Sequence, residues 1–293
     1  MAKDSPVEGW RRGPMSLSPA LDPYRLPPSE RCWWCDDKAT TEEHRFKLST
    51  LRRVARADTG QEDPRTVFKK SDDWEGLLRS IRKGAQVRWR KNMCAKCNNQ
   101  RSQPFDLAYD TMEAFIVTHA DDMMKWSRLS WADVYGAQWQ QGAADLARYF
   151  GKQLGCMLAT QRLPVPAELI GFLNGAKRCP PIAFMILRNW RAGDMHRTML
   201  RDGFDDGITN FVGLLPATAY SREERFSAVD YVYHIGYVWF CVNWTEETDR
   251  SSWWEHDTID MPMVNGELLS RLNWRILSVR ERLRRARRRD QPT

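Results

Sequence analysis

Two cysteine pairs at Cys-x-x-Cys spacing constrain the fold of this chain more than any other feature. Cys32 and Cys35 form the first pair, Cys94 and Cys97 form the second, and 58 residues separate the two pairs. Four thiolates carried on two such turns suit a tetrahedral Zn²⁺ with a structural role. A redox pair and a chance spacing are the alternatives. Because the separation exceeds that of a zinc ribbon, we expect the intervening segment to be an insertion that returns to the first turn.

The other cysteines and the composition indicate a globular protein without membrane segments. Cys156, Cys179 and Cys241 have apolar neighbours and are expected to be buried core thiols. The chain has 293 residues, 42% of them hydrophobic, which suffices for one large domain or two smaller ones. The longest apolar runs, 182–187 and 237–242, are far shorter than the roughly 20 residues that span a bilayer. We therefore expect a soluble, cytoplasmic protein.

Positive charge is concentrated in two parts of the chain, although the net charge of the whole is only +7. Residues 45–101 hold 16 Lys and Arg against 6 Asp and Glu, and residues 275–293 hold 8 against 2. Such segregation is typical of proteins that bind a polyanion, so we expect a nucleic-acid partner. A solvated basic face without any ligand is the alternative.

Hydrophobic periodicity predicts a helical middle and a β-rich end. Helices are expected at 45–56, 72–83, 102–119, 131–158, 164–175 and 181–200, with Ser102 as an N-cap and Pro104 in the following turn. Strands are expected at 86–90, 207–220 and 228–244, the last as a bent strand or a tight hairpin. Residues 266–289 indicate a closing basic helix, and residues 1–30 a flexible arm rich in Pro and Ser.

Polar side chains flank both cysteine pairs. The run EEH begins seven residues after Cys35, and Asn98 directly follows the second pair. In this order of Cys-x-x-Cys, acid-His, Cys-x-x-Cys and Asn, residues 31–119 resemble the HNH endonucleases of the treble-clef, ββα-metal type, most closely the branch of phage junction-resolving enzymes. The resemblance does not extend to residues 120–293.

The resemblance implies a site for phosphodiester hydrolysis. It implies that His44 is the general base for the attacking water, and that Glu43 and Asn98 hold a catalytic Mg²⁺ or Mn²⁺ while Zn²⁺ is structural. Imidazole suits the first role because its pKa lies near neutrality. Carboxylate and carboxamide oxygens suit a hard cation that neutralises charge on the phosphate and the leaving oxygen.

Two positions depart from the family pattern. Glu43 stands where Asp is usual, and Glu42 beside it could share its task. The last ligand, which the family often supplies from the following helix, is not evident; Asp106 is our first candidate for it and Gln103 the second. Asn98 could instead be a turn residue that ends the knuckle, and His44 a supporting or surface histidine.

The remaining histidines and the tryptophans carry weaker signals. Helix-end, loop or core positions are the best interpretation for His119, His196, His234 and His256. Trp33 and Trp34 lie inside the first cysteine pair, where stacking on nucleic-acid bases is one hypothesis. Packing in a core or an interface is expected for most of the other tryptophans.

These patterns predict an α+β protein in three parts. They are a flexible arm at 1–30, a treble-clef HNH-like zinc module with a basic insertion at 31–120, and a helical then β-rich domain at 121–293. The leading functional hypothesis is a metal-dependent DNA endonuclease of a phage, mobile element or defence system. One alternative is a zinc-dependent nucleic-acid-binding module without catalysis, and another is an assembly protein whose zinc only stabilises the fold.

Overall fold

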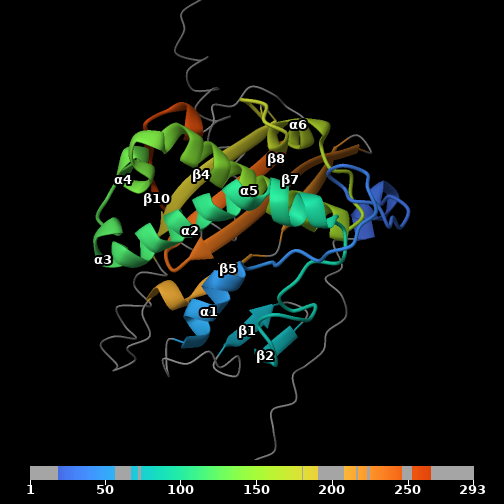
Figure 1. The fold of residues 1–293 in the computed structure, drawn as a ribbon, viewed down its shortest axis with the longest axis horizontal. Helices are drawn as coiled ribbons and strands as arrows, with labels where there is room; N and C mark the ends of the chain where they lie inside the picture. Colours follow the sequence, from blue (N-terminus) through green and yellow to red (C-terminus); the bar gives the residue numbers. More distant parts are fainter. Residues whose placement is uncertain are drawn as a thin grey trace, which may run out of the picture.

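Helices from the middle of the chain lie across a C-terminal β-sheet (Figure 1). This computed structural model describes residues 19–56, 67–71, 74–179, 181–190, 208–215, 217–222, 225–245 and 253–264. The protein is therefore mixed α+β, with a helical middle and a β-rich end, as the periodicity predicted. The arm up to residue 18 and the basic helix expected at 266–289 lie outside the described residues.

The segment between the two cysteine pairs leaves the site and returns to it. A short 3₁₀ turn, η1 (Pro19–Tyr24), precedes this region; the segment itself holds α1 (Leu48–Arg56) and the antiparallel strands β1 (Phe68–Ser71) and β2 (Trp74–Leu77). Isolated bridges join Thr41 to Met93 and His44 to Arg88. The two ends of the insertion are thus paired directly beside the cysteines.

The prediction of a helix at 72–83 is wrong. Residues 74–77 form β2, and the amide of Leu78 extends the hairpin by donating to the carbonyl of Val67. The Ser80 hydroxyl then accepts bonds from the amides of Arg82 and Lys83, which offers the backbone an alternative to a helix. The strand expected at 86–90 is not formed: residues 85–87 make a turn in which the amides of Val87 and Arg88 donate to the carbonyl of Gly84, and only a single bridge at Arg88 follows.

The helical middle agrees closely with the sequence pattern. It contains α2 (Gln103–Thr118), α3 (Ala120–Met123), α4 (Trp131–Tyr135), the 3₁₀ turn η4 (Gly136–Gln138), α5 (Trp139–Thr160) and α6 (Ala167–Leu173). Ser102 is at the N-cap position of α2, although its hydroxyl makes no capping bond there. The helix expected at 131–158 is divided because Gly136 adopts φ 63°.

The main sheet has the strand order β10-β4-β8-β7-β5, with β6 also paired to β7. Its strands are β4 (Ile182–Asn189), β5 (Val212–Leu214), β6 (Thr218–Arg222), β7 (Arg225–Ile235), β8 (Val238–Thr245) and β10 (Met263–Val264). Only β10 and β4 run parallel among these pairs. The tight hairpin expected at 228–244 is confirmed as β7 and β8, which turn at Gly236 with φ 56°.

A separate pair joins β3 (Arg128–Ser130) to β9 (Thr258–Asp260), and the 3₁₀ turns η5 (Ile208–Asn210) and η6 (Trp253–Glu255) complete the described elements.

The prediction of a helix from residue 181 to 200 is wrong where the structure describes it. Residues 182–189 form β4, which lies between β10 and β8 and pairs Ile182 with Trp244 at one end. A short apolar run that is buried on both faces cannot be told from a buried helix by periodicity. The partner strand decided the outcome, and residues 191–200 lie outside the described part.

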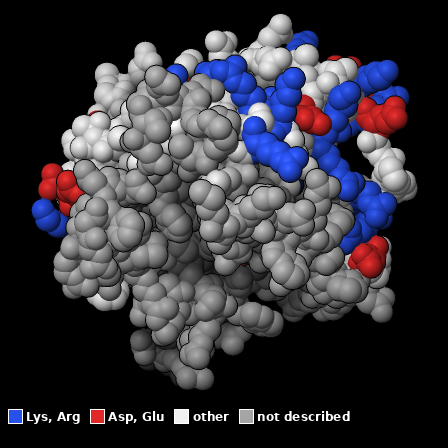
Figure 2. Space-filling model, turned by 90° about the horizontal axis from the view of Figure 1, so that it is seen from below, with Lys and Arg blue, Asp and Glu red and all other residues white. Residues whose placement is uncertain are grey.

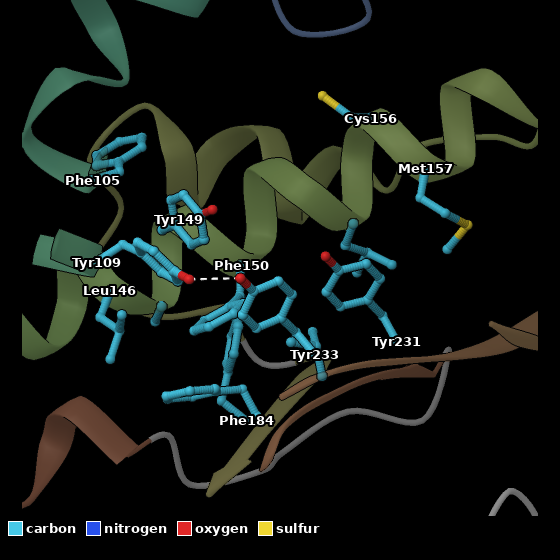
Figure 3. Close-up of a cluster of buried hydrophobic side chains, with 14 of the residues drawn as sticks. Phe105, Tyr109, Leu146, Tyr149, Phe150, Cys156, Met157, Phe184, Tyr231 and Tyr233 are labelled. Atoms are coloured by element: carbon cyan, nitrogen blue, oxygen red, sulfur yellow. Dashed lines mark hydrogen bonds between the residues drawn. The ribbon is translucent and has the colours of Figure 1, made fainter. Parts of the chain in front are cut away.

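Aromatic side chains fill the space between α2, α5 and the sheet (Figure 3). Phe150 on α5 stacks on Phe240 of β8, with ring centroids 4.6 Å apart. The hydroxyls of Tyr109 on α2 and Tyr233 on β7 are hydrogen-bonded at 2.6 Å. One connected set of buried side chains extends from this core to the cysteine pairs.

The three isolated cysteines are buried, as expected for core thiols. Cys156, Cys179 and Cys241 are each at most 2% exposed. Among the described residues, none of the helices is long and apolar enough to cross a membrane.

Candidate metal centre and its acidic neighbours

The four cysteines of the two pairs form one cluster. The Sγ atoms of Cys32, Cys35, Cys94 and Cys97 all lie within 4.8 Å of one another, and those of Cys35 and Cys94 are 3.5 Å apart. Tetrahedral Zn²⁺ with Zn–S bonds of about 2.3 Å requires S···S separations of about 3.8 Å. The arrangement is consistent with a structural Zn²⁺ site, as the spacing predicted.

Local backbone bonds shape both turns of the cluster. In the first, Asp36 takes the left-handed conformation at φ 64° and its amide donates to the carbonyl of Cys32. In the second, the amide of Cys97 donates to Sγ of Cys94, and Arg101 donates to Sγ of Cys97 at 3.4 Å. Such donors stabilise sulfur ligands that carry negative charge.

Burial makes the thiols of Cys35 and Cys97 weaker acids when no metal is bound, whereas at Cys94 burial is outweighed by hydrogen bonds from Cys97 and Cys35 and the pKa is lowered. Burial raises the pKa of Cys35 to about 11, and it also raises the pKa of Cys97 above its ordinary value. Zinc binds thiolates, so loading the cluster must release protons, and zinc affinity should fall as the pH falls.

The tryptophans of the first turn attach it to the helical middle. Trp34 is 3% exposed, donates from Nε1 to Oδ1 of Asn174 at 2.8 Å, and lies beneath the guanidinium of Arg101. Trp33 packs against Gly155 of α5 so closely that a Cβ at Gly155 would overlap its ring. These contacts contradict a base-stacking role for Trp34 and give both rings a packing role.

Two of the candidate acidic residues meet at a buried lysine that the motif does not contain. Nζ of Lys152 on α5 lies 2.9 Å from Oε1 of Glu43 and 2.9 Å from Oδ1 of Asp106. Gln153, the next residue of α5, donates to Oε1 of Glu43 at 3.1 Å and to the carbonyl of His44 at 3.0 Å. Helix α5 therefore takes part in the site, although it lies outside the region of resemblance.

The charges of this group are not fully balanced. Burial acts to lower the pKa of Lys152, but the carboxylates of Glu43 and Asp106 raise it above its ordinary value, so the ammonium stays charged. Burial raises the pKa of Glu43, and the nearby Asp106 adds to this, despite the opposing effect of Lys152. One ammonium thus serves two carboxylates, and further positive charge would be favourable there.

His44 carries an uncharged imidazole with one free nitrogen. Burial lowers its pKa to about 4, and the charges of Arg88 and Lys152 contribute. A hydrogen bond to the backbone of Arg82 opposes this shift, whereas Nε2 is buried and has no partner among the described residues. The Arg82 bond therefore belongs to Nδ1, which leaves Nε2 as a proton acceptor.

Asn98 is linked to Asp106 through Ser102. The Ser102 hydroxyl donates to the carbonyl of Asn98 at 2.8 Å and lies 3.3 Å from Oδ2 of Asp106. The side-chain oxygen of Asn98 is buried and, within the described part of the chain, has no hydrogen-bond partner. Glu42, in contrast, is exposed and faces Arg88, with 4.0 Å between the charged atoms.

Lys47 extends the polar contacts from this group to α2. Its ammonium lies 2.5 Å from Oδ2 of Asp110 and also contacts the backbone carbonyl of Asp106. The Ser49 hydroxyl donates to the same Asp110 carboxylate at 2.8 Å. Lys47 and Ser49 follow His44 closely in the sequence, so the first residues of α1 are held on the same helix as Asp106.

Lys152 and Gln153 escaped the sequence analysis, although a signal was present. They interrupt the apolar run of a helix that is buried along most of its length. A lysine is almost never fully buried unless it is paired, so its place in that run indicated a carboxylate partner. The sequence could not say which carboxylate, because Glu43 is 109 residues away.

Exposed basic side chains lie around the candidate site. They belong mainly to the returning segment and the second turn: Arg79, Arg82, Lys83, Arg90, Lys91 and Lys96. Figure 2 shows Lys and Arg gathered toward one side of the face that it draws. The basic tail lies outside the described residues.

The other histidines lie apart from this site or outside the described residues. His119 is the C-cap of α2, His234 is buried in β7, His256 is exposed after η6, and His196 is not among the described residues. The helix-end and core interpretations hold for His119 and His234.

Comparisons with protein-family models, curated proteins and solved structures found no match for this chain. The resemblance to HNH endonucleases therefore depends on the motif residues themselves. Lys152 joins the carboxylates of Glu43 and Asp106, while Gln153 and Ser102 bond to the backbone carbonyls of His44 and Asn98.

Proposed function

We propose that this protein is a metal-dependent DNA endonuclease with an HNH-like site on a treble-clef zinc module. The observation that carries the proposal is the buried Nε2 of His44, which has no partner among the described residues, in the residue directly after Glu43, whose carboxylate shares the Lys152 ammonium with Asp106. Buried polar atoms in folded proteins almost always have partners, so a free one in a polar group indicates a place for a ligand. The surrounding Lys and Arg side chains suit a phosphate backbone.

The chemical types of the residues present suit a hard divalent cation. Carboxylate oxygens of Glu43 and Asp106 and the free Oδ1 of Asn98 are the ligand types that Mg²⁺ and Mn²⁺ prefer. Burial, together with the nearby Asp106, raises the pKa of Glu43, so a cation bound there would favour the ionised carboxylate. When bound, the cation would supply Lewis-acid stabilisation of charge on the phosphate and on the leaving oxygen.

His44 would accept the proton of the attacking water. Its lowered pKa keeps the imidazole uncharged at neutral pH, and the bond from its other nitrogen to Arg82 fixes the ring orientation. The same shift weakens the imidazole as a base, so proximity to the water must contribute to the rate.

One observation favours a second function, that of a zinc-dependent nucleic-acid-binding module without catalysis. The Lys152 ammonium already lies between the two carboxylates and supplies positive charge there. If it replaced the cation entirely, the basic surface would bind nucleic acid and no bond would be cleaved.

A plasmid-nicking assay with Mg²⁺ or Mn²⁺ separates the two functions. We expect the wild-type protein to nick or linearise DNA, and His44→Ala to lose about 10²- to 10⁴-fold in rate because a proton acceptor is removed. Zinc content and DNA affinity should stay close to wild type. His256→Ala is the matched control, since that histidine is exposed and remote in sequence.

Wild-type protein that binds DNA but is inert with every divalent metal and DNA form tested would establish the binding module instead. Cleavage by His44→Ala at the wild-type rate would remove the catalytic role of His44. Cleavage of RNA alone would change the substrate class.

A further inference from the structure

We infer that Lys152 is a positioning residue of the proposed nuclease site, an inference that rests on the proposed function. Its buried ammonium holds the carboxylates of Glu43 and Asp106 in place and limits how strongly they bind a divalent cation. The C-terminal half of the chain thereby completes a site whose recognisable motif lies wholly in the N-terminal half.

The contacts of Lys152 select particular oxygen atoms. Both Lys152 and Gln153 approach Oε1 of Glu43, and the contact with Asp106 uses Oδ1. Neither bond uses Oε2 of Glu43 or Oδ2 of Asp106. Glu43 is therefore fixed through Oε1, and among the described residues its Oε2 is left for another interaction. Asp106 is held through both oxygens, because its Oδ2 lies 3.3 Å from the Ser102 hydroxyl.

Stabilisation of the fold alone does not explain a buried lysine at this position. Lys152 is 0% exposed, and removing charges from water costs about as much as their attraction returns, so buried ion pairs contribute little net stability. Apolar side chains surround it on the same helix, including Phe150 and Leu154, and they show what packing alone would place there. A buried ammonium is useful where carboxylates must stay ionised and in register.

Replacing Lys152 should raise the affinity for a divalent cation and lower the cleavage rate at saturating metal. Lys152→Gln keeps hydrogen-bond donors but removes the positive charge, so the carboxylates should attract a divalent cation more strongly. The same change releases the carboxylates from their fixed geometry, so cleavage at saturating metal should become slower. A role in stability alone would change neither the cation affinity nor the position of the carboxylates relative to it.

Mn²⁺ binding to the zinc-loaded full-length protein, followed by electron paramagnetic resonance without DNA, tests the first effect. For Lys152→Gln we expect the half-saturating Mn²⁺ concentration to fall about tenfold. In the nicking assay at saturating Mn²⁺, we expect its rate to fall about tenfold. Lys125→Gln is the control, because Lys125 is exposed and pairs with Asp122 three residues earlier.

Lys152→Arg provides a second variant should Lys152→Gln fail to fold. It keeps the charge, so Mn²⁺ affinity should stay within about twofold of wild type, but the planar fork of the guanidinium should displace the carboxylates and slow cleavage. Wild-type cleavage by Lys152→Arg would overturn the positioning role.

Unchanged Mn²⁺ affinity in folded Lys152→Gln would overturn the limit on cation binding. If wild-type protein cleaves nothing, the proposed function fails, whereas tighter Mn²⁺ binding by Lys152→Gln would still support the effect of Lys152 on the carboxylates. The two failures are therefore distinguishable.

Discussion

The zinc region and the sheet use different physical means to pack against the same helix, α5. The sheet contacts α5 through aromatic rings, such as Phe240 of β8 against Phe150. The zinc region also packs Trp33 against Gly155 of α5, but it adds directed hydrogen bonds, in which Trp89 donates to Gln153 at 2.8 Å and Asn92 donates to the carbonyl of Cys156 at 2.9 Å. The first kind of contact depends on filled volume, and the second depends on exact partners.

This difference explains why a candidate reactive site lies on the polar side of α5. Directed bonds hold particular atoms in particular places, whereas apolar packing tolerates exchange of side chains of similar volume. The polar side also carries the four-cysteine cluster, so its stability should depend on bound metal. We therefore expect the two regions to fail under different treatments.

The largest effect should follow from breaking the cysteine cluster. Cys97→Ser removes one of four zinc ligands, and structural zinc sites contribute on the order of 10 kcal/mol to the folding of small domains. We expect loss of bound zinc and an unfolded zinc region, measured by elemental analysis and circular dichroism. Cys241→Ala is the control, since Cys241 is equally buried but lies in the sheet, and it should keep one zinc per chain.

A folded Cys97→Ser protein with one tightly bound zinc would contradict the structural role of the cluster. Well-folded wild-type protein without zinc would contradict the zinc assignment itself.

A smaller effect is expected from opening the apolar side of α5. Phe150 is fully buried, so Phe150→Ala should lower the free energy of unfolding by about 3–5 kcal/mol, measured by denaturant titration of zinc-loaded protein. Zinc content should not change in the folded fraction, because no ligand is touched. Phe211→Ala is the control, since Phe211 is 52% exposed and its loss should cost less than about 1 kcal/mol. Equal losses from the two substitutions would refute the packing role of Phe150.

The smallest expected effect is the pH dependence of unfolding that one buried histidine from each region contributes. Burial lowers the pKa of both His44 and His234 to about 4, whereas an unfolded histidine titrates near 6.5. Between these values the unfolded chain binds more protons, so the free energy of unfolding should fall as pH falls from about 6.5 to 4, and should level off below that for these groups.

Unfolding midpoints at pH 7 and pH 5 test this dependence. His44→Gln and His234→Gln should each show a smaller loss between the two pH values than wild type does. His256→Gln, at an exposed position, should keep the full loss. If both buried variants keep the wild-type pH dependence, the lowered pKa values do not apply in solution.

Several elements could be predicted because their signals are local. Ser102, Pro104 and the apolar spacing that follows them identified α2 within a residue at each end. The β-branched and aromatic residues of 228–244 identified strand structure there, and the length of the run allowed the hairpin of β7 and β8. The spacing of the cysteines identified the cluster, because two turns that each present a pair of thiols need only to meet.

Other elements depended on partners far away in the chain. Residues 182–189 became a strand because β8 pairs with them, and residues 74–77 became a strand because β1 does. Both segments have apolar spacing that a helix could equally use, so only the pairing energy of a distant or preceding strand decided between the two forms.

The amino-acid sequence by itself determined which chemistry the N-terminal region can support: four thiols, an imidazole, carboxylates and a carboxamide in a fixed order. Only the tertiary structure decided that Lys152 and Gln153 of α5 share a site with Glu43, because that contact joins residues more than a hundred positions apart. Ligand type is a property of single residues and their spacing. The number of charges that surround a ligand is a property of the packed fold, since it depends on which buried groups have been brought together.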